Sequence, residues 1–384
     1  MNRKQFLMLM IALVVLGGVG LGLFWQDIAA YRSTGAKIGA RLLPNLKLAD
    51  VAYIQVRDAR NVATLARKDN RWVVDERGGY PANFQEISDV VIKLIELKVV
   101  QSEEIGATLL PRVGLAPPPE KAAADVKEDQ AKEIGTRIEM KDAAGKTLAT
   151  MTLGKVVLKK DPGNPLPNAQ NGVPAGRYVQ VAGAQNVAVV SDPLEKVSAD
   201  PAKWLDKTFF KADRVKTLTV ANESGVRWKI TRDEEWGQWK FASGGGDLDA
   251  SAAVGAANAL SSWTFEDVAT TPAEAGDKPT TVTAETFDRL TYTFRITPRK
   301  AGGYLLNGNV EGEPTAQRTP EKDEKADVKA RRDKEYAETL KKLQERVARE
   351  RALSKWTYVM DAKTIAPLVR ERSDLVAAPP PKKK

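Results

Sequence analysis

The chain of 384 residues contains no cysteine and no histidine. Without cysteine it has no disulfides, no thiol nucleophile and no thiolate ligand for a metal. Without histidine it lacks the usual general base, the Ser-His-Asp triad and the commonest ligand of zinc and iron. Catalysis would therefore have to rely on carboxylates, lysines, tyrosines and hydroxyls, which excludes most of the common enzyme classes.

Familiar catalytic and nucleotide-binding motifs are also missing. The sequence has no phosphate loop of the GxxxxGK[ST] type, so the chain is not itself an ATPase of that class. The glycines from Gly17 to Gly22 resemble a dinucleotide fingerprint only superficially, because they lie in an apolar run and follow no strand. We predict no catalytic, cofactor-binding or metal-binding residues and a protein that is not an enzyme. An exported hydrolase that uses carboxylates is kept as a third alternative.

Two local features allow a binding interpretation beside a structural one. In the loop from Gly244 to Asp249, the carboxylates of Asp247 and Asp249 are close enough in sequence to share a cation. The favoured interpretation is that Asp249 caps the following helix. Several tryptophans would suit a sugar-binding groove, but their recurrence at equivalent positions favours packing in the core; they are Trp72, Trp204, Trp236, Trp239, Trp263 and Trp356.

Charge is plentiful but mixed. Hydrophobic residues make up 42% and charged residues 28% of the chain, as in globular proteins. Part of the net charge of +9 lies at the two ends, and more lies between Glu321 and Ala352, where basic and acidic residues alternate. A mixed surface of this kind does not indicate binding of nucleic acid.

The longest uncharged run extends from Phe6 to Trp25, between Lys4 and Asp27. As a helix it would span the roughly 30 Å hydrocarbon core of a bilayer, and Trp25 would lie at the interface. We predict a transmembrane anchor here. The alternative is a cleaved signal peptide, for which the small residues at 28–30 form only a weak cleavage site. Basic residues ahead of the run favour a cytoplasmic N-terminus, with the remainder exported.

The pattern of strands and helices occurs twice, about 164 residues apart. In each copy short strands lead to a helix with one apolar face, opened by Asn83 in the first copy and by Asp249 in the second. The first face consists of Ile87, Val90, Val91, Leu94 and Leu97, and the second of Ala253, Ala257, Leu260 and Trp263. A period of this length indicates duplicated domains, since solenoid repeats are shorter.

Hairpin patterns follow each predicted helix. We match the hairpin from Arg137 to Gly154 with the one from Leu290 to Gly308. The strands Arg177–Val181 and Trp356–Met360 are matched in the same way, and each is expected to precede a short helix, from Pro193 and from Lys363. The sequence thus predicts an α+β fold: an N-terminal transmembrane helix, then two tandem, repeated, strand-rich α+β domains with mainly antiparallel sheets.

A long charged helix is expected from Glu321 to Ala352. Its apolar residues form a seam of barely two heptads, too short to establish a coiled coil; they are Tyr336, Leu340, Leu343 and Val347. The favoured interpretation is a solvated helix that packs this narrow stripe on the second domain. The alternative is a projecting arm that meets a partner protein.

Short segments spread from Val51 to Val376 resemble a known family; they are Trp72, Tyr80-Pro81-Ala82-Asn83, Val113-Gly114-Leu115, Leu153-Gly154 and Gly176-Arg177-Tyr178-Val179. With the N-terminal anchor, they make the chain similar to bacterial proteins of a large uncharacterised-domain family, often encoded beside gliding-motility-type ABC transporters and akin to their GldG-like auxiliary components. The resemblance implies a membrane-anchored, extracytoplasmic accessory protein working with an ABC transporter or a related envelope complex. It implies no catalytic residues.

These observations give the following expected organisation: a membrane anchor (1–30), a tether (31–48), a first α+β domain (49–208), a second with the charged helix near 321–352 (209–376), and a disordered tail rich in proline and lysine (377–384). The expected location is the bacterial inner membrane, with the domains on the periplasmic side. The expected partners are the permease and ATPase of an ABC transporter or other envelope proteins, with residues 6–25 in the membrane, no nucleic acid and no cofactor. The alternative function is an envelope scaffold that binds polysaccharide or protein without a transporter.

Overall fold

The computed structural model describes residues 38–123, 125–159, 172–270, 276–320 and 324–377. By its internal contacts the chain separates into two compact units, one ending at Trp204 and the other beginning at Leu205. The predicted membrane segment, residues 6–25, lies outside the described residues. Within those ranges, none of the helices combines the length and the apolar character needed to cross a bilayer.

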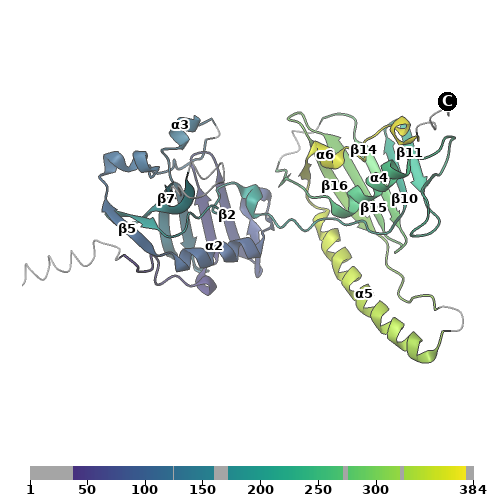
Figure 1. The fold of residues 1–384 in the computed structure, drawn as a ribbon, viewed down its shortest axis with the longest axis horizontal. Helices are drawn as coiled ribbons and strands as arrows, with labels where there is room; N and C mark the ends of the chain where they lie inside the picture. The colour runs from purple at the N-terminus through teal and green to yellow at the C-terminus, as the bar shows by residue number, and fades with distance from the viewer. Residues whose placement is uncertain (1–37, 124, 160–171, 271–275, 321–323, 378–384) are drawn as a thin grey trace, which may run out of the picture. The chain divides into compact units, whose positions relative to one another are not determined.

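The first unit is built on one antiparallel sheet (Figure 1). Its strands are β1 (Tyr53–Arg57), β2 (Val62–Lys68), β3 (Arg71–Val74), β4 (Tyr80–Pro81), β5 (Val99–Glu104), β6 (Thr136–Lys141), β7 (Thr147–Lys159), β8 (Val173–Val181) and β9 (Asn186–Val190). They are arranged in the order β4-β3-β2-β1-β6-β7-β8-β9-β5. Every neighbouring pair is antiparallel, as predicted.

Helix α2 (Phe84–Glu96) supplies the other half of the core of this unit. The Asn83 side chain accepts hydrogen bonds from the main-chain N–H groups of Gln85 and Glu86, which fixes where the helix begins. The predicted apolar face is buried, and so are alternate residues of β1, Ile54 and Val56. The helical stripe and the sheet face therefore shield each other from water. Shorter helical turns are η1 (Leu48–Asp50), η2 (Asp75–Arg77), η3 (Ala107–Val113), α3 (Glu128–Ala131) and η5 (Pro201–Trp204).

The described part of the predicted tether lies along the edge of this sheet. Gly39 N–H donates to the Val99 carbonyl, Leu42 N–H donates to the Leu97 carbonyl, and Val99 N–H donates to the Ala40 carbonyl. Leu43 and Leu46 are buried. These contacts hold residues 39–46 against the start of β5.

The second unit has the same kind of sheet. Its strands are β10 (Val215–Asn222), β11 (Gly225–Thr231), β12 (Lys240–Phe241), β13 (Asp267–Val268), β14 (Thr280–Thr286), β15 (Thr291–Pro298), β16 (Tyr304–Glu311) and β17 (Tyr358–Met360). They are arranged in the order β12-β11-β10-β14-β15-β16-β17-β13. The helices are α4 (Ala250–Ser262), α5 (Ala326–Leu353) and α6 (Ala362–Ile365), and η7 (Arg372–Leu375) follows.

The two sheets follow the same order when their strands are matched along the chain. In each unit the first strand (β1 or β10) lies between two neighbours. One is its hairpin partner (β2 or β11), and the other is the strand that follows the helix and the edge strand in sequence (β6 or β14). In each, the helix leads to the strand at the opposite edge, β5 in the first unit and β13 in the second. The predicted face of α4 is also buried, and Asp249 caps that helix by accepting from Ala252 N–H.

The matching of hairpins from sequence is wrong by one strand. Residues 137–154 lie in β6 and β7, whose counterparts in the strand order are β14 and β15, whereas residues 290–308 lie in β15 and β16. Three strands, β4, β9 and β14, were not recognised; Tyr80 and Pro81 were expected to break the sheet but pair with β3. β14 has the sequence TTVTAET, in which threonine and alanine give little contrast between its two faces.

The short helix expected from Pro193 is also wrong. The carboxylate of Asp192 accepts a hydrogen bond from Leu194 N–H at 2.7 Å, and Leu194 has a φ of 52°. This side-chain turn competes with helix formation and reverses the chain instead. The helix expected near Lys363 is present as the four-residue α6, capped by Asp361.

Helix α5 is the predicted charged helix, and Figure 1 shows it beside β16 at its C-terminal end. Val347 is buried, and Tyr336, Leu340 and Leu343 are half-buried. The Tyr336 hydroxyl donates to the Thr315 carbonyl at 2.6 Å. Only the C-terminal end of the predicted stripe therefore packs beside the sheet, and Tyr336, Leu340 and Leu343 lie against the segment 314–319. The rest of the helix projects from the sheet (Figure 1), as in the alternative interpretation, and its opposite face is exposed.

A buried carboxylate fixes the C-terminal end of α5. Glu350 is only 1% exposed and accepts hydrogen bonds from Lys211 N–H at 3.0 Å and from the Tyr292 hydroxyl at 2.8 Å. The Arg346 Nε atom lies 3.6 Å from the same carboxylate. Burial raises the pKa of Glu350 above its ordinary value of 4.5. The cluster joins α5 to β15 and to the segment that precedes β10.

We expect the Glu350→Gln variant to gain stability relative to the natural protein as pH rises. Because the pKa of Glu350 is higher in the folded than in the unfolded protein, the protonated carboxyl group stabilises the fold, and it does so fully at pH values below the unfolded pKa. That contribution is lost as pH rises through the folded pKa, and glutamine does not titrate. Denaturation midpoints of both full-length chains between about pH 4 and pH 8 measure the difference.

Glu345→Gln, at an exposed position on the same helix, is the control and should show a smaller pH dependence. If the Glu350→Gln variant instead loses stability relative to the natural protein as pH rises, the ionised carboxylate of Glu350 is more stable in the folded than in the unfolded protein. That result would contradict a raised pKa.

Candidate functional site

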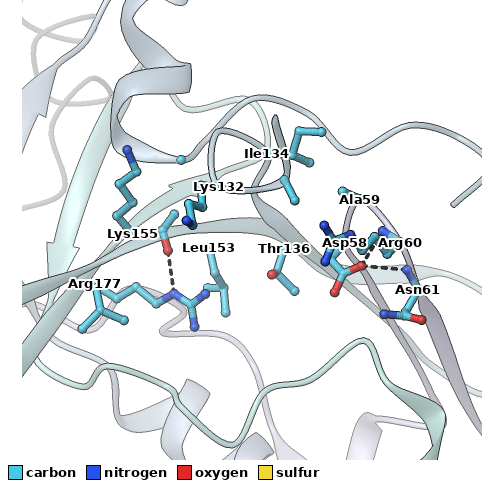
Figure 2. Close-up of a pocket in the computed structure, with 14 residues that line it drawn as sticks. Asp58, Ala59, Arg60, Asn61, Lys132, Ile134, Thr136, Leu153, Lys155 and Arg177 are labelled. Carbon is cyan, nitrogen blue, oxygen red and sulfur yellow. Dashed lines mark hydrogen bonds between the residues drawn. The ribbon is translucent and has the colours of Figure 1, made fainter. Parts of the chain in front are cut away.

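A cavity of about 510 Å³ opens in the first unit (Figure 2). Its lining comes from the β1–β2 turn, from the residue after η3, from α3 and the start of β6, and from the adjoining parts of β7 and β8. Its volume falls within the range of small-molecule binding sites, about 300–1,000 Å³. The lining residues are Asp58, Ala59, Arg60, Asn61, Gly114, Ala131, Lys132, Ile134, Thr136, Leu153, Gly154, Lys155, Val156 and Arg177.

Among the described lining residues the cations dominate, with Arg60, Lys132, Lys155 and Arg177 against the carboxylate of Asp58. The Asp58 Oδ1 atom accepts from the main-chain N–H groups of Arg60 and Asn61, at 2.8 and 2.7 Å, so it is committed to the β1–β2 turn. The cavity as a whole is therefore positively charged.

Arg177 is the cation most firmly held in place. Its Nε atom donates to the Gly154 carbonyl at 2.8 Å, and its Nη1 atom lies 3.4 Å from the carbonyls of Pro193 and Leu194. Burial lowers the pKa of Arg177, although an arginine remains charged at any ordinary pH. Among the described residues, no carboxylate forms an ion pair with it. Figure 2 shows its side chain extended along the cavity, with Asp58, Arg60 and Asn61 grouped on the other side.

The other cations differ in how far they are neutralised. The Lys132 ammonium pairs with Glu128 at 2.9 Å, a solvent-exposed contact that raises its pKa. The Lys155 ammonium donates to the Arg112 carbonyl at 2.7 Å, and the Arg60 guanidinium donates to the Val126 carbonyl at 2.8 and 3.0 Å. Carbonyl oxygens position these two groups without cancelling their charge.

Three of the segments that carry the family resemblance meet at this cavity. Gly114 and Gly154 come from two of them, and Arg177 from the third. A Cβ atom on Gly154 would overlap the Val113 carbonyl oxygen and lie 2.9 Å from Leu115 Cγ. Gly114 has a φ of 68°, in the left-handed region that favours glycine. The glycines therefore permit the close packing of main chains that forms the cavity wall.

The alternatives weighed from the sequence have separate outcomes. Asp249 serves as a helix cap, as described above, and within the described ranges there is no group of three or more acidic, histidine or cysteine residues that could hold a metal ion. Trp204 and Trp263 are buried in the cores of their units, and Trp72, Trp239 and Trp356 are half-buried. Trp236 is 91% exposed, so packing in the core does not explain it.

Trp236 borders a second cavity, of about 430 Å³, in the second unit. Polar groups surround it, including Asp213, Arg232, Asn258 and Ser261. The Arg214 guanidinium donates to both carboxylate oxygens of Glu235 at 2.8 Å, a paired geometry that orients both groups. An exposed indole beside oriented polar groups can stack against a sugar ring and hydrogen-bond its hydroxyls.

No protein-family model, no curated protein and no solved structure matches this chain.

We expect Gly154→Ala to destabilise the protein by about 1–3 kcal/mol, because the added methyl group is forced against the Val113 carbonyl and Leu115. Gly106→Ala is the matched control, since a Cβ atom there meets nothing within 4 Å and the residue has a φ of −60°. Denaturant unfolding of the two full-length variants measures the difference. Equal stability of both variants would show that the cavity wall is not packed as described.

Proposed function

We propose that this chain is a membrane-anchored, extracytoplasmic accessory protein that acts by binding, as an auxiliary component of an ABC-type transport system in the bacterial inner membrane. The observation that carries the proposal is the cavity of the first unit, where three segments of the family resemblance converge around cationic side chains. The uncharged run from Phe6 to Trp25 supports the anchor, and the basic residues before it support export of the remainder.

The shared order of strands supports a duplicated architecture, in which two copies of one α+β domain follow the anchor. The two copies differ in their surface features. The first has the cationic cavity, and the second has the inserted helix α5, whose exposed face combines lysines and glutamates, among them Glu338, Lys341 and Lys342. Charges of both signs on this face can orient a partner of complementary charge.

The anchor adds to the affinity of such contacts. Confinement to the membrane holds the two units near a permease at high effective concentration, so individually weak contacts are sufficient. The proposal therefore requires neither turnover nor tight binding by any single surface.

Gentle crosslinking in native membranes, followed by detergent purification and mass spectrometry, tests this proposal. We expect the permease and its ATPase to be recovered with the natural chain. A control chain with residues 1–30 replaced by a cleaved signal peptide should recover much less, because it lacks the anchor. Absence of both transporter chains, under conditions that preserve other membrane complexes, would contradict the transporter role.

The exposed Trp236 favours a second candidate, an envelope scaffold that binds polysaccharide. In that case the same purification recovers envelope glycan with the natural chain but not with Trp236→Ala. The control is Val226→Ala, which also removes an exposed apolar side chain, 64% exposed, from the second unit. Transporter chains without glycan would exclude this candidate.

A further inference from the structure

We propose that the cationic cavity of the first unit binds a small organic anion, with a carboxylate or phosphate head group joined to an apolar body. This inference rests on the proposed binding function and names the class of ligand for the same site.

The head group would be held by Arg177. Carbonyl oxygens on β7 and on the turn at Pro193 fix the position of its guanidinium before any ligand arrives. Its Nη2 atom has no hydrogen-bond partner among the described residues, so two donors of the rigid fork are available to an oxyanion. A preoriented guanidinium loses little conformational entropy on binding, which favours the interaction.

Further groups of suitable charge lie around the same space. The Thr136 hydroxyl lines the cavity, whereas the Lys155 side chain directs its ammonium away from Arg177, toward the Arg112 carbonyl (Figure 2). The carboxylate of Asp58 is occupied by the β1–β2 turn. The positive charge of Lys155 therefore favours an anion in the cavity without a direct contact to the head group at Arg177.

Part of the remaining lining is apolar, which favours a ligand larger than a bare ion. The half-buried Ile134 and Val156 contribute hydrocarbon surface to a space of about 510 Å³, whereas Ala59 and Leu153 are buried behind it. Inorganic phosphate or acetate would leave most of that surface in contact with water. A ligand with a short hydrocarbon body would cover it, and each buried methylene would improve binding by about fourfold.

Arg177 also has a structural role, because it ties β8 to Gly154 and to the turn at Pro193. If that were its whole function, its removal would lower stability without any anion having been bound. Binding by the natural, folded chain, compared between matched ligands, separates the two possibilities.

The test is calorimetric titration of the full-length chain, in nanodiscs of phosphatidylcholine, with acetate, hexanoate, hexanamide and inorganic phosphate. Hexanoate and hexanamide share a hydrocarbon body and differ in charge. We expect hexanoate to bind at least about tenfold more tightly than hexanamide, since hydrogen bonds to charged groups are worth about 1.5–3 kcal/mol. Hexanoate should also bind more tightly than acetate.

Two variants place the binding in this cavity. Arg177→Gln should weaken hexanoate binding about tenfold, because it removes the hydrogen bonds to the head group. Lys155→Gln should weaken it by a smaller factor, because it removes only a nearby positive charge. Lys146→Gln, an exposed lysine in the turn between β6 and β7, should leave it unchanged. Lys155 is exposed and its substitution need not disturb the fold, so the Lys155→Gln measurement remains informative even if Arg177→Gln is unstable.

Nanodiscs that contain phosphatidylglycerol show whether the natural anion is a lipid or a soluble molecule. If phosphatidylglycerol competes with hexanoate, the head group belongs to a lipid. If hexanoate binds equally well in its presence, the head group belongs to a soluble anion.

Equal binding of hexanoate and hexanamide, or no binding of hexanoate up to about 10 mM by the folded chain, would overturn the inference. Neither result depends on recovery of transporter chains. Failure of anion binding and failure of the proposed transporter role are thus separate outcomes.

Discussion

Both units depend on one constraint: a single helix has to carry the chain from one edge of the sheet to the other. In the first unit α2 joins β4 to β5, which are the two edge strands. From Pro81 to Val99 the chain consists of about 18 Å of helix and, at its two ends, extended steps of about 3.3–3.6 Å each, so that it can span at most about 38–40 Å. Nine strands laid flat would separate the edges by about 38 Å. The helix and its connections just match this width, so α2 has to lie across the sheet, where its apolar face and the inner face of the strands are buried together.

The elements that the sequence predicts best are those with a strong period and a definite end. The apolar faces of α2 and α4 and the cap at Asp249 were expected, because helical spacing and a capping side chain are local signals. Strand matching failed for a physical reason. Alternation with a period of two looks alike in every strand, so a shift by one strand leaves the pattern intact while changing which hairpins correspond. β14 shows a similar limit, because its threonines and alanines give little contrast between two faces. The turn at Leu194 was missed although Asp192, two residues before it, is a local turn signal.

The site is less predictable than the fold because its parts are distant in sequence. Arg60, Lys155 and Arg177 come from different strands or turns, and nothing near them distinguishes them from the other basic residues of this chain. No site residue was predicted here from the sequence. The glycine-containing segments were singled out only for the family resemblance, and at the cavity their glycines permit close packing. Glu350 is a similar case: one glutamate in a charged helix becomes a buried contact only through Lys211 and Tyr292.

The central claim is that both units work outside the cytoplasm while the anchor holds them at the membrane. Because the natural chain has no cysteine, single introduced cysteines report location without background. The most direct test is labelling with a membrane-impermeant maleimide in cells with a permeabilised outer membrane. Lys146→Cys and Lys300→Cys, both at exposed turns, should be labelled in intact cells, and Asn2→Cys only after lysis. Labelling of Lys146→Cys and Lys300→Cys only after lysis would place the units in the cytoplasm and contradict the account.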